Sequence, residues 1–354
     1  MSEILGLGLT HYPPLARPDE DMSWPLRWTL EDPDIPAAAK DPASWPAQMQ
    51  DEWSTDRGAR AATDHRRLVV EQMDRCRAAL DQFRPDVVII WGDDQYENFR
   101  EDLIPPYAVL AYPDMEIHPW RSAGESSGML GKPNVWKEGP DTSFLAKGRP
   151  DIARWLTKAL LDDGIDVSYA YKPLHHPELP HAFLNTLLFL DYHRRGFDYP
   201  IIPFPINCYG SRVISHKGFL ARFAAGGELD PPSPVPWRVM DVGAAVARAC
   251  AASPYRVALV ASSGWSHAFT TDKTWRLYPD IEADRLLYKA MVNRDVEVWR
   301  KYTTEQIEAS GQQELLNWFA LVGAMEELDR SPNHTTFLET HVFNSSKAFA
   351  IFEP

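Results

Sequence analysis

Apolar runs that end in polar residues dominate the pattern along this chain. Four of them are long enough to form buried strands, and they lie at 4–11, 87–95, 167–176 and 257–267. Three of the four bring histidine to the end of the run. The carboxyl ends of parallel strands meet at one edge of a sheet, where α/β proteins place their ligands. We therefore predict that these ends converge on one pocket, laid out like an enzyme active site.

Helical periods alternate with these strand-like runs. The pattern predicts strands at about 4–10, 87–91, 165–171, 199–207, 256–262 and 347–352. It predicts helices at about 61–83, 150–163, 183–193, 239–252, 280–301 and 304–328. The alternation favours a single α/β domain spanning residues 1–354.

Residues 17–58 break this alternation. The segment is rich in proline and carries four tryptophans, Trp24, Trp28, Trp45 and Trp53. It is too apolar for a flexible linker, so we predict an insertion that packs over the body of the protein or against a second subunit.

Composition narrows the function classes. The formal net charge of −14 argues against nucleic acid, because phosphate binding needs clustered lysine and arginine. The three cysteines are too scattered for a zinc knuckle or a disulfide framework. No run reaches membrane-spanning length and no signal-peptide pattern opens the chain, so we expect a soluble, reduced, cytoplasmic protein.

Two of the strand ends carry side chains suited to binding. His11 precedes Pro13-Pro14, which cannot continue a sheet interior, so this histidine is expected to face a cleft. The segment 92–99 packs three acids and two amides directly after an apolar strand. It is either a solvated acidic loop or a set of oxygen donors for a divalent cation or a hydrogen-bonded substrate.

Other candidates suit proton transfer. His175 and His176 lie in a proline-rich loop, and one of them is expected to act as an acid–base or substrate-polarising group. His267 follows small residues that allow close approach of a ligand, whereas no G-x-S-x-G elbow supports a serine hydrolase. Glu314, judged from composition alone, favours a solvated or capping role. The histidines without such a context, read as structural or surface residues, are His118, His193, His216, His334 and His341.

Several motifs occur in the order of a known family. They are Thr10-His-Tyr-Pro, Gly92-Asp-Asp-Gln, Ile202-Pro-Phe-Pro-Ile-Asn, Ser263-Gly-Trp-Ser-His, Glu314-Leu-Leu-Asn-Trp and the closing stretch 341–352. Together they resemble the class III extradiol ring-cleavage dioxygenases, the superfamily of the protocatechuate 4,5-dioxygenase β subunit. The Gly-Asp-Asp-Gln variant is most similar to proteins of the 3-O-methylgallate dioxygenase type. The resemblance implies a largely parallel central sheet flanked by helices on both faces, and assembly as a dimer or with a small helical partner.

The resemblance also implies roles for individual residues. His11 and Glu314 fall on two ligands of the family's two-histidine, one-carboxylate site for non-haem Fe(II). His267 falls on the catalytic acid–base histidine, and His175 or His176 on a further pocket histidine. Such a site leaves positions open for a catecholate and for O₂.

One departure changes the expected metal chemistry. Where many family members carry the second histidine ligand, this chain reads Asp93-Asp94-Gln95. If Asp94 ligates, the site becomes neutral overall and holds Mn(II), Mg(II) or Ca(II) comparatively better. If Gln95 ligates, the charge is kept but the ligand is weaker. The third possibility is that no metal binds.

Three functions therefore stay open. The first is an extradiol dioxygenase that opens the ring of a catecholic or gallate-like aromatic acid with O₂. The second is an enzyme of the same fold without oxygen chemistry, such as a hydrolase, lyase or decarboxylase on phenolic acids. The third is a catalytically silent subunit paired with an active homologue. Retention of His11, His267 and Glu314 favours an enzyme, and a homodimer is the expected assembly, with 17–58 covering the pocket mouth. The substrate itself is not identified, and the candidate carboxylate binders are Arg17, Arg121 and Arg212.

Overall fold

A six-stranded sheet lies at the centre of the computed structural model, which describes residues 3–122, 132–213, 216, 222–223 and 226–354. Its order within these residues is β7-β2-β8-β1-β10-β9. The strands are β1 (Ile4–Leu9), β2 (Val87–Gly92), β7 (Ile201–Pro205), β8 (Val257–Ser262), β9 (His334–Leu338) and β10 (Lys347–Phe352). The first four in the sheet order are mutually parallel, and β10 runs antiparallel to both of its neighbours. The predicted largely parallel sheet is confirmed.

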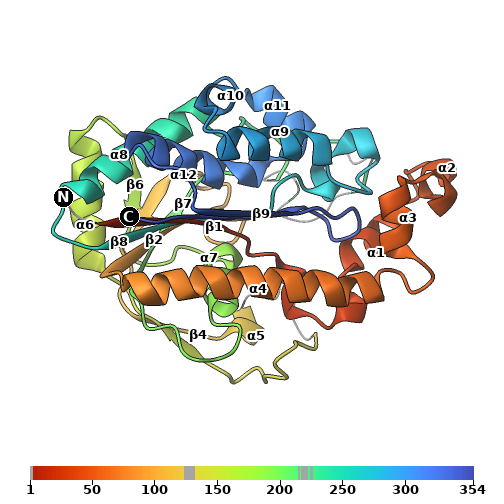
Figure 1. Cartoon of the computed structure of the whole chain (residues 1–354), viewed down its shortest axis with the longest axis horizontal. Helices are drawn as coiled ribbons and strands as arrows, with labels where there is room; N and C mark the ends of the chain where they lie inside the picture. The colour runs from red at the N-terminus through yellow and green to blue at the C-terminus, as the bar shows by residue number, and fades with distance from the viewer. Residues whose placement is uncertain (1–2, 123–131, 214–215, 217–221, 224–225) are drawn as a thin grey trace.

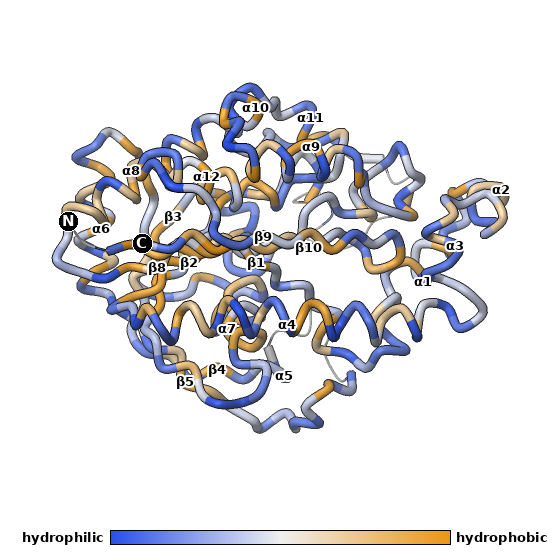
Figure 2. The backbone as a smooth tube through the Cα atoms, in the orientation of Figure 1, coloured by the Kyte–Doolittle hydropathy of each residue, from blue (hydrophilic) through white to orange (hydrophobic). Residues whose placement is uncertain are grey.

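Helices cover both faces of this sheet (Figure 1). One face packs against α8 (Pro236–Ala251) and α12 (Leu316–Glu327), with α9 (Ile281–Val292) and α10 (Val296–Arg300) beyond them. The other face packs against α4 (Ala59–Phe83) and α7 (His181–Leu190). The hydropathy of these elements accounts for the packing (Figure 2). The strands are mostly apolar, whereas α4 alternates between apolar and polar stretches as a half-buried helix does. The α/β fold class with helices on both faces is confirmed.

Glycines allow α12 to approach the sheet and α8 closely. A Cβ atom at Gly8 of β1 would overlap the ring of Trp318. One at Gly243 of α8 would overlap the backbone of Ala320, and one at Gly323 would overlap the backbone of α8. The start of α12 is therefore held firmly against the sheet, which fixes the turn before it in space.

The predicted strand at 165–171 lies outside the central sheet. Its observed core, β6 (Ser168–Ala170), pairs in parallel with β3 (Ala108–Leu110), and β4 (Met115–Ile117) pairs with β5 (Phe144–Ala146). Tyr169 is 54% exposed, so this three-residue strand is not buried on both faces as the strands of the parallel core are. The expectation that its end joins the other strand ends was wrong.

Several helices differ from the predicted bounds. The predicted helix at 304–328 is divided into α11 (Thr304–Ala309), a 3-10 turn (Gln313–Leu315) and α12, with a break at Gly311, whose φ is 64°. The predicted helix at 280–301 breaks at Arg294, whose φ is 57°. Hydrophobic periodicity continues through such breaks and does not reveal them. The helix predicted at 150–163 corresponds to α6 (Pro150–Asp162), and α7 begins at His181, earlier than predicted.

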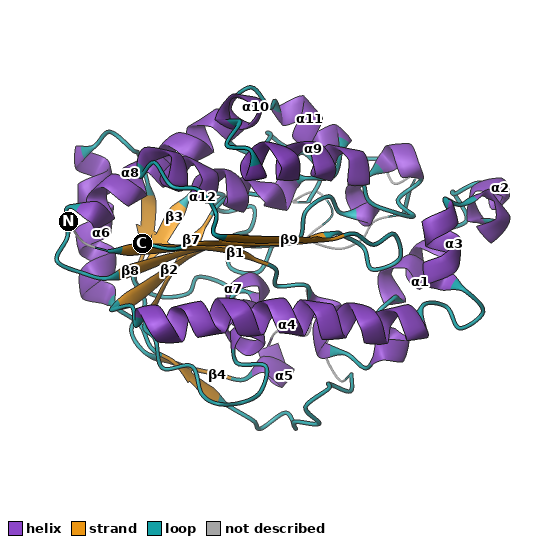
Figure 3. Cartoon of the chain, viewed as in Figure 1, coloured by secondary structure: helices purple, strands orange, loops and turns teal. Residues whose placement is uncertain are grey.

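Residues 17–58, called the arm below, form short helices at one end of the molecule (Figure 3). They are the 3-10 turn Asp19–Asp21, α1 (Trp24–Leu30), α2 (Ala37–Lys40), the 3-10 turn Pro42–Ser44 and α3 (Ala47–Trp53). Met22, Leu26 and Met49 are buried against the main body. The remaining short elements are the 3-10 turns Pro13–Ala16, Ala268–Thr270 and Asp272–Thr274 and the helical turn α5 (Pro119–Ser122).

Among the described residues, no helix combines the length and apolar character needed to cross a membrane.

Candidate active site

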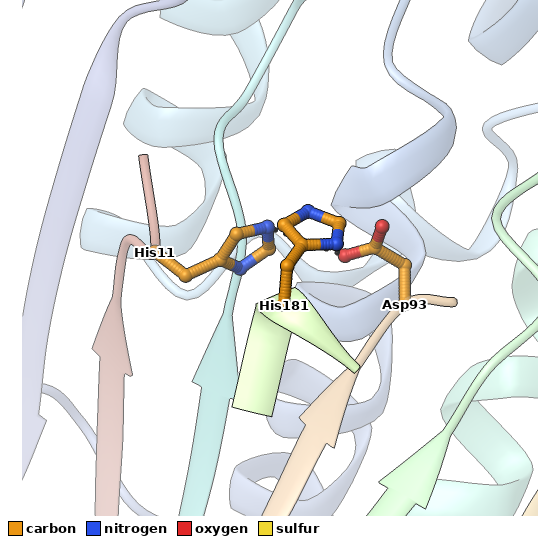
Figure 4. Close-up of side chains that lie close together, drawn as sticks. All are labelled: His11, Asp93 and His181. Atoms are coloured by element: carbon orange, nitrogen blue, oxygen red, sulfur yellow. Dashed lines mark ion pairs between the residues drawn. The ribbon is translucent and has the colours of Figure 1, made fainter. Parts of the chain in front are cut away.

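Three strand ends and one helix start converge at the carboxyl edge of the sheet. His11 follows β1, Asp93 follows β2 directly, and His267 lies in the loop after β8. His181 is the first residue of α7. Figure 4 shows His11, Asp93 and His181 pointing toward one another, and one potential ligand atom from each lies within 4.8 Å of the other two.

His11 is oriented by the backbone of the neighbouring strand. Its Nδ1 lies 3.0 Å from the carbonyl oxygen of Ser262 and donates to it. Its Nε2 then faces Asp93 Oδ1 at 3.4 Å and Glu314 Oε2 at 3.6 Å. Burial lowers the pKa of His11 well below its usual value, so the ring is neutral and its Nε2 carries a lone pair. This is the state in which histidine binds a metal.

Two carboxylates beside His11 lack normal partners. Neither oxygen of Asp93 has a hydrogen-bond partner among the described residues, and the side chain is fully buried. Glu314 Oε1 accepts a hydrogen bond from Gln95 Nε2 at 2.7 Å, whereas its Oε2 has none within the same part of the chain. Burial raises the pKa of Asp93 to about 6 and that of Glu314 well above its usual value. Buried carboxylates without donors are costly unless a cation neutralises them, so this donor set fits a divalent metal.

His181 is a member of the cluster that the sequence analysis did not single out. Its Nδ1 donates to Glu97 Oε2 at 2.8 Å, and its backbone N–H donates to the other oxygen at 3.0 Å. Although burial disfavours the charged ring, the carboxylates of Glu97 and Asp93 raise the pKa of His181 to about 10, so the ring carries a proton at neutral pH that a bound metal would displace. A carboxylate behind one ring nitrogen is the usual way in which proteins orient a metal-binding histidine. The available signal was its place after Pro180, at the start of a helix that has no polar face.

The acidic segment after β2 divides its residues between two tasks. Asp94 accepts hydrogen bonds from the backbone N–H groups of residues 97, 98 and 99 and from the Tyr209 hydroxyl, and therefore caps a turn. Gln95 orients Glu314. Of the three neighbours, Asp93 is the one that joins the histidines in the cluster, whereas the sequence analysis considered Asp94 and Gln95 as ligands.

His267 lies on the other side of Glu314. Its Nε2 is 3.3 Å from Glu314 Oε2, and its backbone N–H donates to the Gly311 carbonyl at 2.7 Å. Burial, with help from the charge of Lys347, lowers the pKa of His267 to about 3. The ring is thus neutral at physiological pH, and its lowered pKa makes it a weak base in the metal-free protein.

Lys347, from the closing sequence motif, is fully buried close to this histidine. Its Nζ donates to the carbonyls of Phe343 and Ser345 and lies 3.6 Å from the centre of the Tyr12 ring. Ser345 in turn forms a β-bridge with His267. The lysine therefore contacts both Ser345, which pairs with His267, and Tyr12, which follows His11.

The other predicted site residues lie outside this cluster. His175 Nε2 pairs with Asp102 at 2.9 Å, and His176 Nδ1 lies 3.1 Å from the Glu178 carbonyl. Of the candidate carboxylate binders, Arg17 lies over the Trp24 ring and Arg121 pairs with Asp141. Arg212 lines a pocket beside the cluster.

A pocket of about 660 Å³ adjoins the cluster. Gln95, which binds Glu314, and Phe269, whose ring lies 5.3 Å from that of His267, are both part of its wall. Its size is that of a pocket for a small organic molecule. The buried polar groups thus lie beside a space that a substrate can enter.

Comparisons with known proteins relate the chain distantly to dioxygenases of dihydroxylated aromatic acids. A 2,3-dihydroxyphenylpropionate/2,3-dihydroxicinnamic acid 1,2-dioxygenase of Pseudomonas putida is 26% identical over 200 residues, which are 56% of this chain and 49% of the relative. An Azotobacter vinelandii enzyme of the same name is 25% identical over 193 residues, 54% of this chain and 47% of the relative. A Photorhabdus laumondii enzyme of the same name is 24% identical over 222 residues, which are 63% of this chain and 55% of the relative. The chain therefore spans about half the length of the curated relatives it matches. No family model matches the sequence.

Proposed function

We propose that this protein is a metal-dependent extradiol dioxygenase that opens the ring of a catecholic aromatic acid. The observation that carries the proposal is Asp93, a fully buried carboxylate without a hydrogen-bond donor, which faces two histidines at the edge of the sheet. The names of the distant relatives and the adjoining pocket support the same reaction class.

The residues that would hold the metal are His11, His181, Asp93 and Glu314. Nitrogen and carboxylate ligands suit Fe(II), the metal expected for this class, and also Mn(II). When bound, the ion would acidify a ring hydroxyl and offer neighbouring positions to the catecholate and O₂. Two carboxylates balance the charge of a divalent ion, so the site attracts an anionic catecholate less than a site with one carboxylate does.

The chain's own groups then position and deprotonate the substrate. His267 is neutral and buried, and its lowered pKa by itself makes the ring a weak base. We assign it the proton of a ring hydroxyl because its Nε2 lies 3.3 Å from Glu314 Oε2. Gln95 donates to Glu314 and holds that carboxylate in one orientation. Phe269 offers an apolar face beside His267, against which an aromatic ring can pack.

The second carboxylate also keeps an alternative function open. Because Asp93 stands where a histidine would keep the site positively charged, a same-fold enzyme that moves protons without O₂ is the second candidate. The two candidates predict the same metal ligands but differ in their need for oxygen.

The test is metal content and oxygen consumption measured together. Protein purified without oxygen is analysed by mass spectrometry for metals, and O₂ uptake is followed on 2,3-dihydroxyphenylpropionate, protocatechuate, gallate and 3-O-methylgallate. We expect about one iron per chain and O₂ uptake with at least one substrate. Bound metal with oxygen-independent turnover would favour the second candidate, and protein that binds no metal under any condition would refute both.

Variants separate the roles. Asp93→Ala and Glu314→Ala should lose the metal, whereas His267→Ala should keep it and lose turnover. His193→Ala is the matched control, because His193 is an exposed histidine that pairs with Asp74 away from the cluster. A metal-loaded, active Asp93→Ala variant would contradict the ligand assignment.

A further inference from the structure

A buried cation forms part of the pocket wall. Arg276 is only 8% exposed, and its Nε donates to Asp272 Oδ1 at 2.7 Å. Arg212, which also lines the pocket, donates from Nη1 to the second oxygen of the same carboxylate at 2.9 Å. One aspartate therefore holds two arginines together, and the three side chains carry one net positive charge.

The loop that carries His267 also builds this group. The hydroxyl of Thr271 donates to the His267 carbonyl at 2.7 Å, and the backbone N–H of Arg276 donates to the Thr271 carbonyl at 3.1 Å. Trp275 and Arg276 have φ values of 55° and 59°, a conformation that residues other than glycine rarely adopt. This sharp reversal turns the loop back on itself, so His267 and the arginine pair are fixed relative to each other.

His216 adds a third nitrogen-bearing side chain to the same wall. Its Nε2 is buried and has no hydrogen-bond partner among the described residues. Burial and the charges of Arg276 and Arg212 lower the pKa of His216, whereas the charge of Asp230 opposes the shift. All three side chains, His216 and the two arginines, line the same pocket. A neutral histidine in this position can donate one hydrogen bond without adding charge.

The acids of the pocket do not cancel this charge where it is buried. Glu308 accepts hydrogen bonds from the backbone N–H of Ser211 at 2.9 Å and from its hydroxyl at 3.2 Å. Glu305 is exposed on α11, where water screens its charge. The least exposed charge of the pocket wall is therefore the guanidinium of Arg276.

We propose that Arg276, Arg212 and His216 form a subsite for the carboxylate of the substrate. In this arrangement the aromatic ring lies toward Gln95 and Phe269, beside the candidate metal ligands. The carboxylate lies at the part of the pocket wall that the two arginines and His216 form. Guanidinium groups match carboxylates because their N–H donors are paired and planar. The inference rests on the proposed function for the ring end, and it selects substrates whose dihydroxylated ring carries a carboxylate over neutral catechols.

Binding of inert ligands tests the subsite without any turnover. The affinities of 3-phenylpropionate and of its uncharged amide are measured by titration calorimetry on the metal-loaded protein. We expect the carboxylate to bind at least 10-fold more tightly than the amide. Arg276→Met and the more exposed Arg212→Met should each remove most of this preference and leave the affinity for the amide within about 2-fold. Arg121→Met, an exposed arginine outside the pocket, should change neither value.

The possible results separate this inference from the proposed function. Equal affinity for acid and amide, no binding of either, or a preference that survives both arginine substitutions would overturn the subsite. If Arg276→Met fails to fold, judged by its thermal transition, the Arg212→Met result decides. A carboxylate preference that depends on the arginines, in a protein that consumes no O₂ on any catecholic acid, would uphold the subsite and refute the dioxygenase.

Discussion

Asp93 and Asp94 are adjacent in sequence but differ in the hydrogen bonds that their carboxylates accept. Both are buried at the end of β2, and burial raises the pKa of each to about 6. Asp94 accepts hydrogen bonds from three backbone N–H groups and from the Tyr209 hydroxyl, whereas Asp93 has no donor among the described residues. One carboxylate builds the turn, and the other is left for a ligand.

This difference bears on how a folded protein can keep a buried carboxylate that lowers its stability. A buried carboxylate with its donors in place stabilises the chain that surrounds it, whereas one without donors destabilises the folded state until a cation binds. Asp284 is intermediate, because it accepts from the Ser266 backbone and from the Gln312 amide. The three residues form a series in which the number of donors decreases from Asp94 through Asp284 to Asp93.

The largest effect is expected from Asp94→Ala. Removing this carboxylate leaves the backbone N–H groups of the turn and the Tyr209 hydroxyl buried without an acceptor, which should lower the free energy of unfolding by about 3 to 5 kcal/mol. Urea unfolding followed by tryptophan fluorescence measures it. Asp94→Asn keeps one acceptor oxygen and serves as the milder control. A loss below about 1 kcal/mol in the alanine variant would show that the turn does not depend on Asp94.

Asp93→Asn should have the opposite effect on the metal-free protein. Since this substitution removes a buried charge that has no donor, the apo protein should become more stable by about 1 to 2 kcal/mol. Its affinity for Fe(II) or Mn(II) should fall by about 100-fold or more, because a charged ligand is lost. Competition with a coloured chelator measures the affinity, and urea unfolding in a strong chelator measures the stability. An asparagine variant that is less stable and binds metal normally would reverse the assignments of Asp93 and Asp94.

The sequence predicted the parallel core of the sheet but neither its edge strand β9 nor this distinction. Apolar runs and helical periods predict the parallel core, because burial on both faces demands continuous apolar strands. They also place the residues after β1, β2 and β8 at one edge, where the structure brings His11, Asp93 and His267 together. Beyond the end of β2, however, alternation no longer governs side-chain direction. Tyr96 adopts a φ of 64°, and the turn around it decides which acid faces inward.

His181 and Glu314 show a second limit. Glu314 points to the cluster because the chain breaks at Gly311 and forms a 3-10 turn, and the continuous apolar period hides this break. His181 lies in the cluster because α7 begins earlier than its apolar residues suggest. Helix ends are set by individual hydrogen bonds, here a long-range one from the His181 backbone to Glu97, and the hydrophobic period does not encode them.

The pH dependence of stability tests the intermediate position of Asp284 between Asp94 and Asp93. Burial raises its pKa to about 8, although the Gln312 amide and the Ser266 backbone oppose the shift. Its folded pKa lies above the unfolded value, so its stabilising contribution is complete below about pH 4 and is lost as the pH rises through 8. The free energy of unfolding should fall by up to about 1.4 kcal/mol per pH unit over this window. Urea unfolding between pH 5 and 8 should show a shallower slope for Asp284→Asn than for the wild type. Equal slopes would mean that Asp284 is ionised at neutral pH.

The smallest expected effect concerns a carboxylate whose donors come from a distant part of the chain. Glu52 of the arm accepts hydrogen bonds through Oε2 from the Thr340 hydroxyl at 2.8 Å and from the backbone N–H groups of His341 and Val342 at 2.9 and 3.1 Å. Although burial opposes it, the hydrogen bonds from His341 and Thr340 lower the pKa of Glu52. The contribution of this carboxylate should therefore be present at neutral pH and be lost as the pH falls through its lowered pKa.

Glu52→Gln should weaken this attachment of the arm without removing it. An uncharged amide oxygen accepts these hydrogen bonds less strongly, so the loss at pH 7 should be about 1 kcal/mol. Limited proteolysis should cut the arm of the variant faster than that of the wild type. Glu31→Gln, an exposed glutamate in the same arm, is the control and should leave both measurements unchanged. If Glu52→Gln matches this control, the arm is held by its buried apolar residues, and donors alone do not make a buried carboxylate stabilising.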